Sequence, residues 1–438
     1  MVGEIFRSTW SLFFGMILLM LGNGLQGTLI GWRANFEGFS SSTTGWIMTG
    51  FYVGILTGSF LTTKFIRRVG HVRVFAALAS LASAALLAQA IIIEPFTWGA
   101  MRLITGFCYA GIFVIVESWL NERSDNHSRG MVLSIYLFIS LGGLAGGQWL
   151  FNWGDPTGLF LFILGSILLS VALVPVLLTP TVAPEINEYE SMSPLKLFRL
   201  VPAGVASILL SSVAVGVIVG MGPVYAASEG MSITRVASFM SIIFAFGAIA
   251  HIPLGWLSDR IDRRLVIMGA CIVAALLSIA LLEIDVTSSL FIIVFGCLGA
   301  MVMPIYSLGM AHTNDRLSPQ QMPNASGTIV LIYGIGAAIG PITTGYIIKL
   351  FGNVSFIYYL GAINLLTGLL MLFWIFQRKA VPEQEQVDFQ LAPSQATVLT
   401  MDAIAYEAEE LIQAEADEEK EDQNDAPENV NDEVDTKT

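Results

Sequence analysis

Twelve long apolar stretches, separated by short polar segments, follow one another through the first 380 residues of the chain. Each approaches or exceeds the ~20 apolar residues with which an α-helix crosses ~30 Å of hydrocarbon. We therefore predict an all-α membrane protein with twelve transmembrane helices. The predicted spans are residues 9–32, 43–65, 72–93, 96–118, 130–152, 157–179, 201–226, 235–257, 264–283, 288–311, 325–350 and 353–377.

The composition agrees with a polytopic membrane protein and excludes a soluble globular one. Of the 438 residues, 55% are hydrophobic and 13% are charged, and the mean hydropathy is +0.71. The first span is too long for a signal-peptide core and no small-residue cleavage site follows it, so we interpret it as a retained helix. Cys108, Cys271 and Cys297 lie in apolar stretches, where packing is expected rather than a disulfide or a metal site.

Basic residues are distributed unevenly between the two ends of the predicted spans. With the N-terminus placed inside, 17 of the 21 Lys and Arg residues fall on that side. The opposite side has Arg33, Arg235 and Lys349, and Arg102 lies within a span. Because cytoplasmic loops carry an excess of Lys and Arg, the sequence predicts a multi-pass protein of a bacterial cytoplasmic (inner) membrane with both termini cytoplasmic.

Proline and charge divide the chain into four segments. Residues 1–180 and 201–379 carry six spans each, and the polar stretch 181–200 joins them as a cytoplasmic linker. Residues 380–438 hold 18 Asp and Glu against two Lys, with too few apolar side chains to form a core. We expect this tail to be disordered, and a partner-docking helix near residues 401–412 is the alternative.

The two six-span segments resemble each other. The sequence Glu37-Gly38-Phe39-Ser40 after the first span recurs 192 residues later as Glu229-Gly230-Met231-Ser232. Gly142 and Gly146 in the fifth span recur 194 residues later in the eleventh. We interpret these repeats as two pseudo-symmetric six-helix bundles.

A turn with five charges in six residues separates the eighth and ninth spans. Its sequence, Gly255-x-Leu257-x-Asp259-Arg260-x-Asp262-Arg263-Arg264, resembles the signature G-x-L-x-D-R-x-G-R-R of the major facilitator superfamily, with Asp262 in place of the usual glycine. The resemblance covers residues 1 to about 379. It implies the major facilitator fold, in which substrate is held between the two bundles near the midplane.

The resemblance implies a gating role for this turn, because such charges hold the cytoplasmic side shut in the outward-facing state. We expect Asp259 to accept hydrogen bonds from the following helix N-terminus, and the arginines to find partners across the two halves. A positive loop that only fixes topology is the alternative. The counterpart after the second span has no acid at the motif position, so the predicted gate is asymmetric. The predicted gating residues are Gly255, Asp259, Arg260, Arg263, Arg264, Arg67 and Arg68.

Arg102 lies within the fourth span, where a charge is costly without a partner or a cavity. The pattern Arg102-x-x-x-Gly106 is similar to the fourth-helix motif of the superfamily, in which the arginine is linked to proton movement. We therefore predict a role for Arg102 in proton coupling. A structural partner elsewhere in the bundle is the alternative.

Glu117 lies 15 residues further along the same span and ~60° around the helix from Arg102, so both side chains can line one cavity at different depths. The string Glu117-Ser118-Trp119-Leu120-Asn121 resembles the YcaD-type branch of the superfamily. Burial disfavours the charged form of a carboxylate, which would let Glu117 exchange a proton near neutral pH. We predict Glu117 as the second proton-coupling residue. Hydration or pairing with Arg67 or Arg68 is the alternative.

Polar side chains inside the spans are the candidates for substrate contact. Asn23 and Gln26 share one face of the first span, among glycines that permit close helix packing. Hydrogen bonding between helices without a substrate is the alternative for this pair. His251 in the eighth span and Tyr306 in the tenth are further candidates, and a packed, satisfied group is the alternative for the histidine.

The sequence predicts a secondary active transporter of a small organic solute that works by alternating access, with proton-coupled export as the leading interpretation. Superfamily drug exporters carry G-x-x-x-G-P in the fifth span, whereas here Gly336-x-x-x-Gly340-Pro341 lies in the eleventh, and this departure weakens an assignment as a multidrug antiporter. The alternatives are a proton-linked importer of a sugar or other metabolite, and a non-transporting membrane receptor or scaffold that acts through the acidic tail.

The expected partners are the solute, protons and the lipid bilayer. No phosphate-binding loop, metal-ligand spacing or catalytic triad occurs in the sequence, so no enzyme activity, cofactor, metal site or nucleic-acid partner is expected. We expect the chain to act as a monomer.

Overall fold

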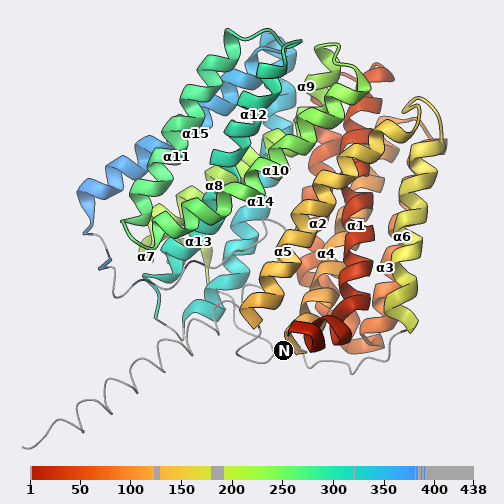
Figure 1. The fold of residues 1–438 in the computed structure, drawn as a ribbon, viewed down its shortest axis with the longest axis horizontal. Coiled ribbons are helices and arrows are strands. Elements are labelled where there is room, and N and C mark those ends of the chain that lie inside the picture. Colours follow the sequence, from red (N-terminus) through yellow and green to blue (C-terminus); the bar gives the residue numbers. More distant parts are fainter. Residues whose placement is uncertain are drawn as a thin grey trace, which may run out of the picture.

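The computed structural model describes residues 2–122, 129–178, 192–318 and 321–379, together with Val381, Pro382, Gln386 and Phe389. Figure 1 shows two helical bundles side by side. The first contains α1 (Val2–Phe36), α2 (Ser41–Val69), α3 (His71–Ile91), α4 (Pro95–Glu122), α5 (Arg129–Leu150), η1 (Phe151–Trp153) and α6 (Phe160–Leu178). The second contains α7 (Pro194–Leu200), α8 (Pro202–Gly216), η2 (Val217–Met221), α9 (Gly222–Ser228), α10 (Ile233–Ser258), α11 (Arg263–Leu282), α12 (Ser289–Val302), α13 (Ile305–Asn314), α14 (Met322–Phe351) and α15 (Ser355–Gln377).

Twelve helical segments of the described chain are long and apolar enough to cross a membrane, which confirms the predicted number. Two of them are interrupted. The seventh runs through α8, the π-helical η2 and α9, and the tenth runs through α12 and α13. Pro304 separates α12 from α13 because its nitrogen has no hydrogen to donate to the helical ladder. The predicted acidic tail lies outside the described residues, apart from its four described positions.

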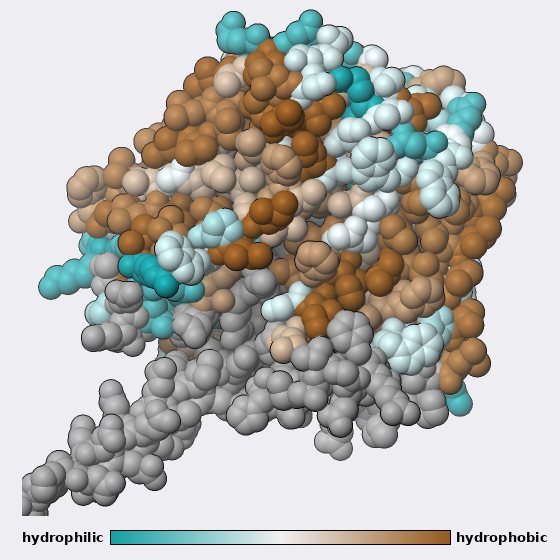
Figure 2. Space-filling view, in the orientation of Figure 1, coloured by the Kyte–Doolittle hydropathy of each residue, from teal (hydrophilic) through white to brown (hydrophobic). Residues whose placement is uncertain are grey.

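A broad band of apolar side chains covers the visible face of both bundles (Figure 2). Large side chains such as Phe138, Leu178 and Phe376 are 76%, 78% and 83% exposed. Exposed apolar surface on this scale requires an apolar environment, and the helix lengths match the hydrocarbon thickness. The fold is therefore that of a membrane-embedded protein.

The turn that the sequence repeats has the same conformation in both halves. In each copy a glycine adopts a positive φ that favours glycine, and a serine two residues later caps the next helix. The pairs are Gly38 (φ +75°) and Gly230 (φ +70°), and Ser40 (3.2 Å to the Thr43 nitrogen) and Ser232 (3.4 Å to the Arg235 nitrogen). The repeat at these positions is therefore one of structure as well as sequence.

Glycines allow the helices within each half to approach closely. A Cβ on Gly54 of α2 would lie 2.1 Å from the carbonyl oxygen of Leu103 in α4. In α5, Gly143 and Gly147 pack tightly against α1. A Cβ added at Gly143 would lie 2.4 Å from the Cβ of Met20, and one added at Gly147 would lie 2.4 Å from the carbonyl oxygen of Leu21. Gly142 faces open space, so the predicted repeat at this position does not mark the packing face of α5.

Contacts between the halves include two equivalent hydrogen bonds. We call the side of the membrane that carries α7 and the α10–α11 turn the linker side, and the opposite side the far side. The Thr49 hydroxyl of α2 donates to the Ala338 carbonyl of α14 at 3.0 Å. The Ser241 hydroxyl of α10 donates to the Ala145 carbonyl of α5, also at 3.0 Å. Both bonds lie toward the far side and join the halves there.

Candidate functional site

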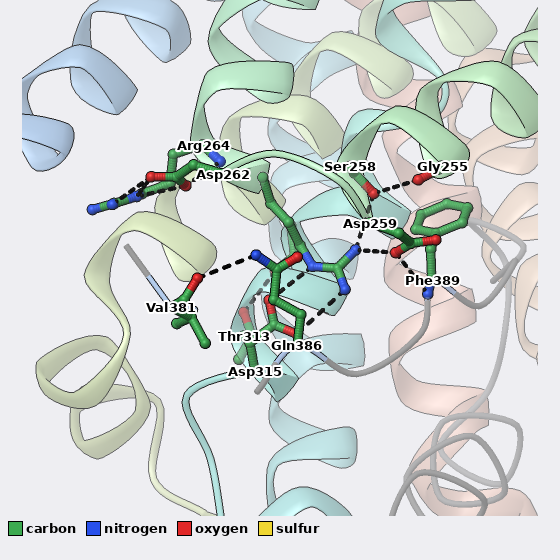
Figure 3. Close-up of polar contacts among 12 residues, drawn as sticks. Gly255, Ser258, Asp259, Asp262, Arg264, Thr313, Asp315, Val381, Gln386 and Phe389 are labelled. Carbon is green, nitrogen blue, oxygen red and sulfur yellow. Dashed lines mark hydrogen bonds and ion pairs between the residues drawn. The ribbon is translucent and has the colours of Figure 1, made fainter. Parts of the chain in front are cut away.

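The turn between α10 and α11 is organised by a buried arginine. Arg263 is 1% exposed. It donates from Nη1 to Oδ1 of Asp259 at 3.0 Å and from Nε to Oδ2 of Asp315 at 2.7 Å. Asp259 ends α10 and Asp315 follows α13, as Figure 3 shows. Because buried charges persist where they are paired, Arg263 fastens the turn to α13.

Asp262 caps α11 and holds the second arginine. Its carboxylate accepts from the backbone N–H of Arg264 at 3.0 Å and pairs with the Arg264 guanidinium, with 2.6 Å between Nη2 and Oδ2. Burial opposes the charge of Asp262, but the hydrogen bonds and positive charge of Arg264 outweigh burial and lower the pKa of Asp262. Arg264 also donates to the carbonyls of Trp374 (3.0 Å) and Arg378 (2.9 Å). The turn is thereby bound to the end of α15.

One prediction about this turn is wrong. Asp262, rather than Asp259, caps α11, because the helix begins only at Arg263. Within the described residues, the carboxylates paired with Arg263 and Arg264 lie in the C-terminal half, whereas partners across the halves were expected. In this conformation the arginines clamp elements of one half together. The aspartate that replaces the glycine of the signature has a direct structural role.

Gly255 provides space for an aromatic side chain of the tail. A Cβ on Gly255 would lie 2.3 Å from the ring of Phe389. The Phe389 N–H donates to Oδ1 of Asp259 at 3.0 Å (Figure 3). The ring also packs against a small apolar cluster that includes Ile267 and Met371. Residue 389 is therefore docked on the predicted gating turn.

The remaining predicted gating residues lie at the surface of the linker side. The Arg260 guanidinium lies over the Trp256 ring, 3.8 Å from its centroid. Arg67 and Arg68 are exposed in the last turn of α2. These three side chains are positioned on the side where a cytoplasmic gate would close, but on different elements.

A narrow cavity of about 30 Å³ lies between the halves. Its walls come from α1, α2, α4 and α5 of one half and from η2 and α10 of the other. Arg102 borders it from α4, is 4% exposed and lies over the ring of Phe51 at 4.3 Å. Asn23 of α1 and Tyr52 of α2 also line this space. We call it the Arg102 cavity.

Glu117 is buried further along α4, toward the linker side, and is 2% exposed. The Tyr136 hydroxyl of α5 donates to its Oε1 at 2.7 Å. Glu117 also lies within electrostatic range of Tyr306 in the opposite half. It is not among the residues that line the Arg102 cavity. Arg102 and Glu117 therefore lie at different depths along α4, and of the two only Arg102 lines this cavity, whereas the sequence suggested that both could line one.

Three of the four predicted substrate contacts do not line the Arg102 cavity, and Asn23 does. The Gln26 amide donates to the Gln89 side chain at 3.4 Å. His251 Nδ1 is 2.7 Å from the Gly247 carbonyl oxygen of its own helix. Tyr306 packs edge-to-face on Tyr333, with 4.8 Å between ring centroids. Among the described residues, no group of three or more His, Cys, Asp or Glu could hold a metal ion.

Sequence reasoning missed Asp315 and Tyr136, the partners of Arg263 and Glu117. They lie 52 and 19 residues from those partners, in other helical segments. An available signal for Asp315 was an acid at the end of a span beside Arg316. Tyr136 gives no signal of its own, because an aromatic residue in an apolar helix normally indicates packing.

Comparisons with known proteins agree with this architecture. The model of the Major Facilitator Superfamily matches the chain over residues 12–329 and 248–403. A protein of Escherichia fergusonii named "Uncharacterized MFS-type transporter YcaD" is 26% identical over 366 residues, which cover 81% of this chain and 94% of the relative.

Two solved structures have a similar fold. The nucleoside transporter NupG superposes with a TM-score of 0.72 at 14% identity, over 85% of this chain and 99% of its own. A bacterial homologue of the human lysosomal transporter Spinster, in an inward-facing and unoccupied conformation, superposes with a TM-score of 0.63 at 13% identity. That alignment covers 94% of this chain and 97% of the homologue.

Proposed function

The chain belongs to the major facilitator superfamily, and from that premise we propose that it exports a small organic solute across a bacterial inner membrane in exchange for protons. Family and fold make it a secondary transporter and a multi-pass inner-membrane protein rather than an enzyme. Solute identity, coupling ion and direction are the parts that we propose.

The observation that carries proton coupling is the Glu117–Tyr136 pair. A carboxylate that is 2% exposed inside a membrane span is costly when charged and is normally retained there for a function. The Tyr136 hydroxyl, 2.7 Å away, can donate to the carboxylate and stabilise the charged form once the proton leaves. A site that tolerates both forms suits a residue that loads and unloads a proton in each cycle. Arg102 sets a positive charge at another level of the same helix.

Alternating access is supported by where the halves join. The Thr49 and Ser241 hydrogen bonds close the far side, and the α10–α11 turn is clamped within the C-terminal half. With both termini placed in the cytoplasm, as the distribution of Lys and Arg predicts, we assign this conformation to the inward-facing state. Asp259, which is paired with Arg263 and has a side chain that is 32% exposed, could then exchange partners with basic residues of the other half when the linker side closes.

The Gly-x-x-x-Gly-Pro sequence of α14 lies at a contact that must open for solute to leave on the far side, although its place in the eleventh span differs from the fifth-span place that it has in superfamily drug exporters. A Cβ on Gly45 of α2 would lie 2.4 Å from the Pro341 carbonyl oxygen. A Cβ on Gly220 of η2 would lie 2.6 Å from the Pro341 ring. The proline therefore lies where α2 of one half meets α14 of the other. A kink-forming residue at this contact suits a helix that bends when the far side opens to release solute.

Everted membrane vesicles with an internal pH reporter test this proposal. Respiration acidifies their interior, and each of a panel of solutes is then added outside. An exchanger for protons carries solute in and protons out, so the interior becomes more alkaline. A proton-linked importer working in reverse carries both inward, so the interior becomes more acidic. No solute-dependent change in vesicles that contain the folded protein would contradict proton-coupled transport.

A further inference from the structure

The charge of the Arg102 cavity points to the chemistry of its ligand. Of the residues that line the cavity, Arg102 carries the one formal charge. The remaining polar side chains are those of Asn23, Thr28, Tyr52 and Gln148, and each is a neutral hydroxyl or amide. The cavity therefore presents a positive potential in a membrane-embedded, low-dielectric setting. Such a cavity attracts an anion and repels a cation.

The Arg102 guanidinium is incompletely paired. Its Nε and Nη1 are buried without a hydrogen-bond partner in the part of the chain that the structure describes. The ring of Phe51 covers one face of the guanidinium at 4.3 Å, which leaves its edge as the side from which the N–H groups donate. Burying donors without acceptors is costly, and the cost is removed when an anion binds.

Among the described residues two other arginines are buried, and both are fully paired, unlike Arg102. Arg263 is buried with two carboxylates, and Arg264 is buried with Asp262 and two backbone carbonyls. Glu117, the acid of the same helix as Arg102, lies 15 residues away, which is about 22 Å along the axis. It accepts a hydrogen bond from Tyr136. The acceptor for Arg102 must therefore come from elsewhere.

The walls of the cavity define the rest of the ligand. Met48, Leu144, Met240 and Phe244 provide apolar surface around the space that Arg102 borders. The Thr28 hydroxyl donates to the side-chain oxygen of Gln148, which fixes that amide at the cavity wall. A planar guanidinium edge matches a planar carboxylate, with two parallel N–H···O bonds. We propose that the Arg102 cavity widens during the transport cycle and then binds small organic monocarboxylates, with the carboxylate on Arg102 and the apolar body against the methionine and aromatic walls.

This inference deepens the proposed function, on which it rests, by naming an organic anion as the solute. It can be tested on purified full-length protein in detergent with a series of phenylalkanoates. The matching phenylalkyl amides and phenylalkyl amines have the same body with a neutral or positive head group. Binding is measured as the ligand-dependent rise in unfolding temperature, because a ligand of the folded state stabilises it.

Carboxylates are expected to stabilise the wild type, and amides and amines are not. Arg102→Gln should weaken carboxylate binding by roughly 10- to 100-fold, since it removes a charge-assisted bidentate contact. Arg102→Lys keeps the positive charge but cannot donate two parallel hydrogen bonds, so this variant should bind carboxylates with intermediate affinity. The matched control is Arg73→Gln, which removes an exposed arginine of α3 and should leave binding unchanged.

Stabilisation of the wild type by amines or amides as well as carboxylates, or by no carboxylate of the series, would overturn the assignment. So would equal binding of carboxylates to wild type and Arg102→Gln. If Arg102→Gln does not fold, the anion site is tested by Arg102→Lys and by comparing carboxylates, amides and amines on the wild type. Carboxylates that bind without moving protons in vesicles would contradict proton coupling alone. Proton flux driven only by neutral or cationic solutes would contradict the anion site alone.

Discussion

Thr49 of α2 and Ser241 of α10 are 192 residues apart and make the same hydrogen bond across the interface between the two halves. Each hydroxyl donates to an alanine carbonyl of the opposite half at 3.0 Å. The separation equals that of the repeated Glu-Gly-x-Ser turns. The internal repeat therefore extends from local turns to the contacts that close the far side.

Loss of these two hydroxyls should open the far side. Thr49→Val and Ser241→Ala each remove one hydrogen bond, worth about 0.5–1.5 kcal/mol, so the double variant should shift the population about tenfold toward outward-facing. The measurement is the rate at which an impermeant thiol reagent, added from the far side, labels a cysteine introduced at Met48 in the cavity wall. Thr57→Val is the matched control, because that hydroxyl donates within α2 at 3.0 Å. An equal rate in all variants would contradict this role.

The buried Arg263–Asp315 pair should make a large contribution to stability. Both side chains are 1% exposed, so Asp315→Ala leaves a buried charge short of a partner and should cost about 3–5 kcal/mol. Glu37→Ala breaks the more exposed Arg33–Glu37 pair and should cost at most about 1 kcal/mol. Unfolding temperatures of the purified variants measure the difference. Similar shifts for the two variants would show that the Asp315 pair does not clamp the C-terminal half.

The lowered pKa of Asp262 predicts a specific pH dependence. A carboxyl group whose pKa is lower in the folded state stabilises the fold above its unfolded pKa of about 3.9, and this stabilisation is lost as pH falls through the folded pKa. Asp262→Asn keeps a helix cap but removes the negative charge that pairs with Arg264. The variant should therefore unfold at a lower temperature than wild type near pH 7, and the gap should close as pH falls below the unfolded pKa and through the folded pKa of Asp262. A gap that is constant with pH would contradict the charge effect.

The fit of Phe389 over Gly255 should be sensitive to one methyl group. Gly255→Ala places a Cβ 2.3 Å from the ring and should displace residue 389, as Phe389→Ala should by removing the ring. Both should accelerate thiol labelling of a cysteine introduced at Gln386, and the double variant should be no faster than either single one. Gly269→Ala is the matched control, because an added Cβ there meets no atom within 4 Å. Unchanged labelling in Gly255→Ala would contradict the docking.

The twelve spans could be predicted because their information is local. Apolar length and charged ends mark each helix. The turns at Gly38 and Gly230 can be recognised in the sequence because a serine that caps the next helix follows each glycine by two residues. The break in the tenth span at Pro304 could not be predicted from the sequence, because other prolines, such as Pro253 and Pro341, lie inside continuous helices. Neighbouring helices decide whether a proline interrupts or only bends.

The polar contacts were less accessible because they depend on helix register and on partners distant in sequence. Because α11 starts at Arg263, Asp262 is the helix cap and Asp259 binds the Arg263 side chain. If the helix started a few residues earlier, Asp259 would be the cap instead. Asn23 and Gln26 share a helix face, yet Asn23 lines the Arg102 cavity while Gln26 binds Gln89 of α3. Sequence places side chains on a face, whereas packing decides what they meet.

The central claim, proton coupling at Glu117, is tested most directly by Glu117→Gln in proteoliposomes loaded with a pH reporter. The amide keeps the shape and can still accept the Tyr136 hydrogen bond, so the variant should fold and bind solute. It cannot release a proton, so an imposed proton gradient should no longer drive accumulation of the solute that is active in the panel, while solute-for-solute exchange persists. Accumulation against a gradient by Glu117→Gln, with the pH dependence of the wild type, would contradict the account.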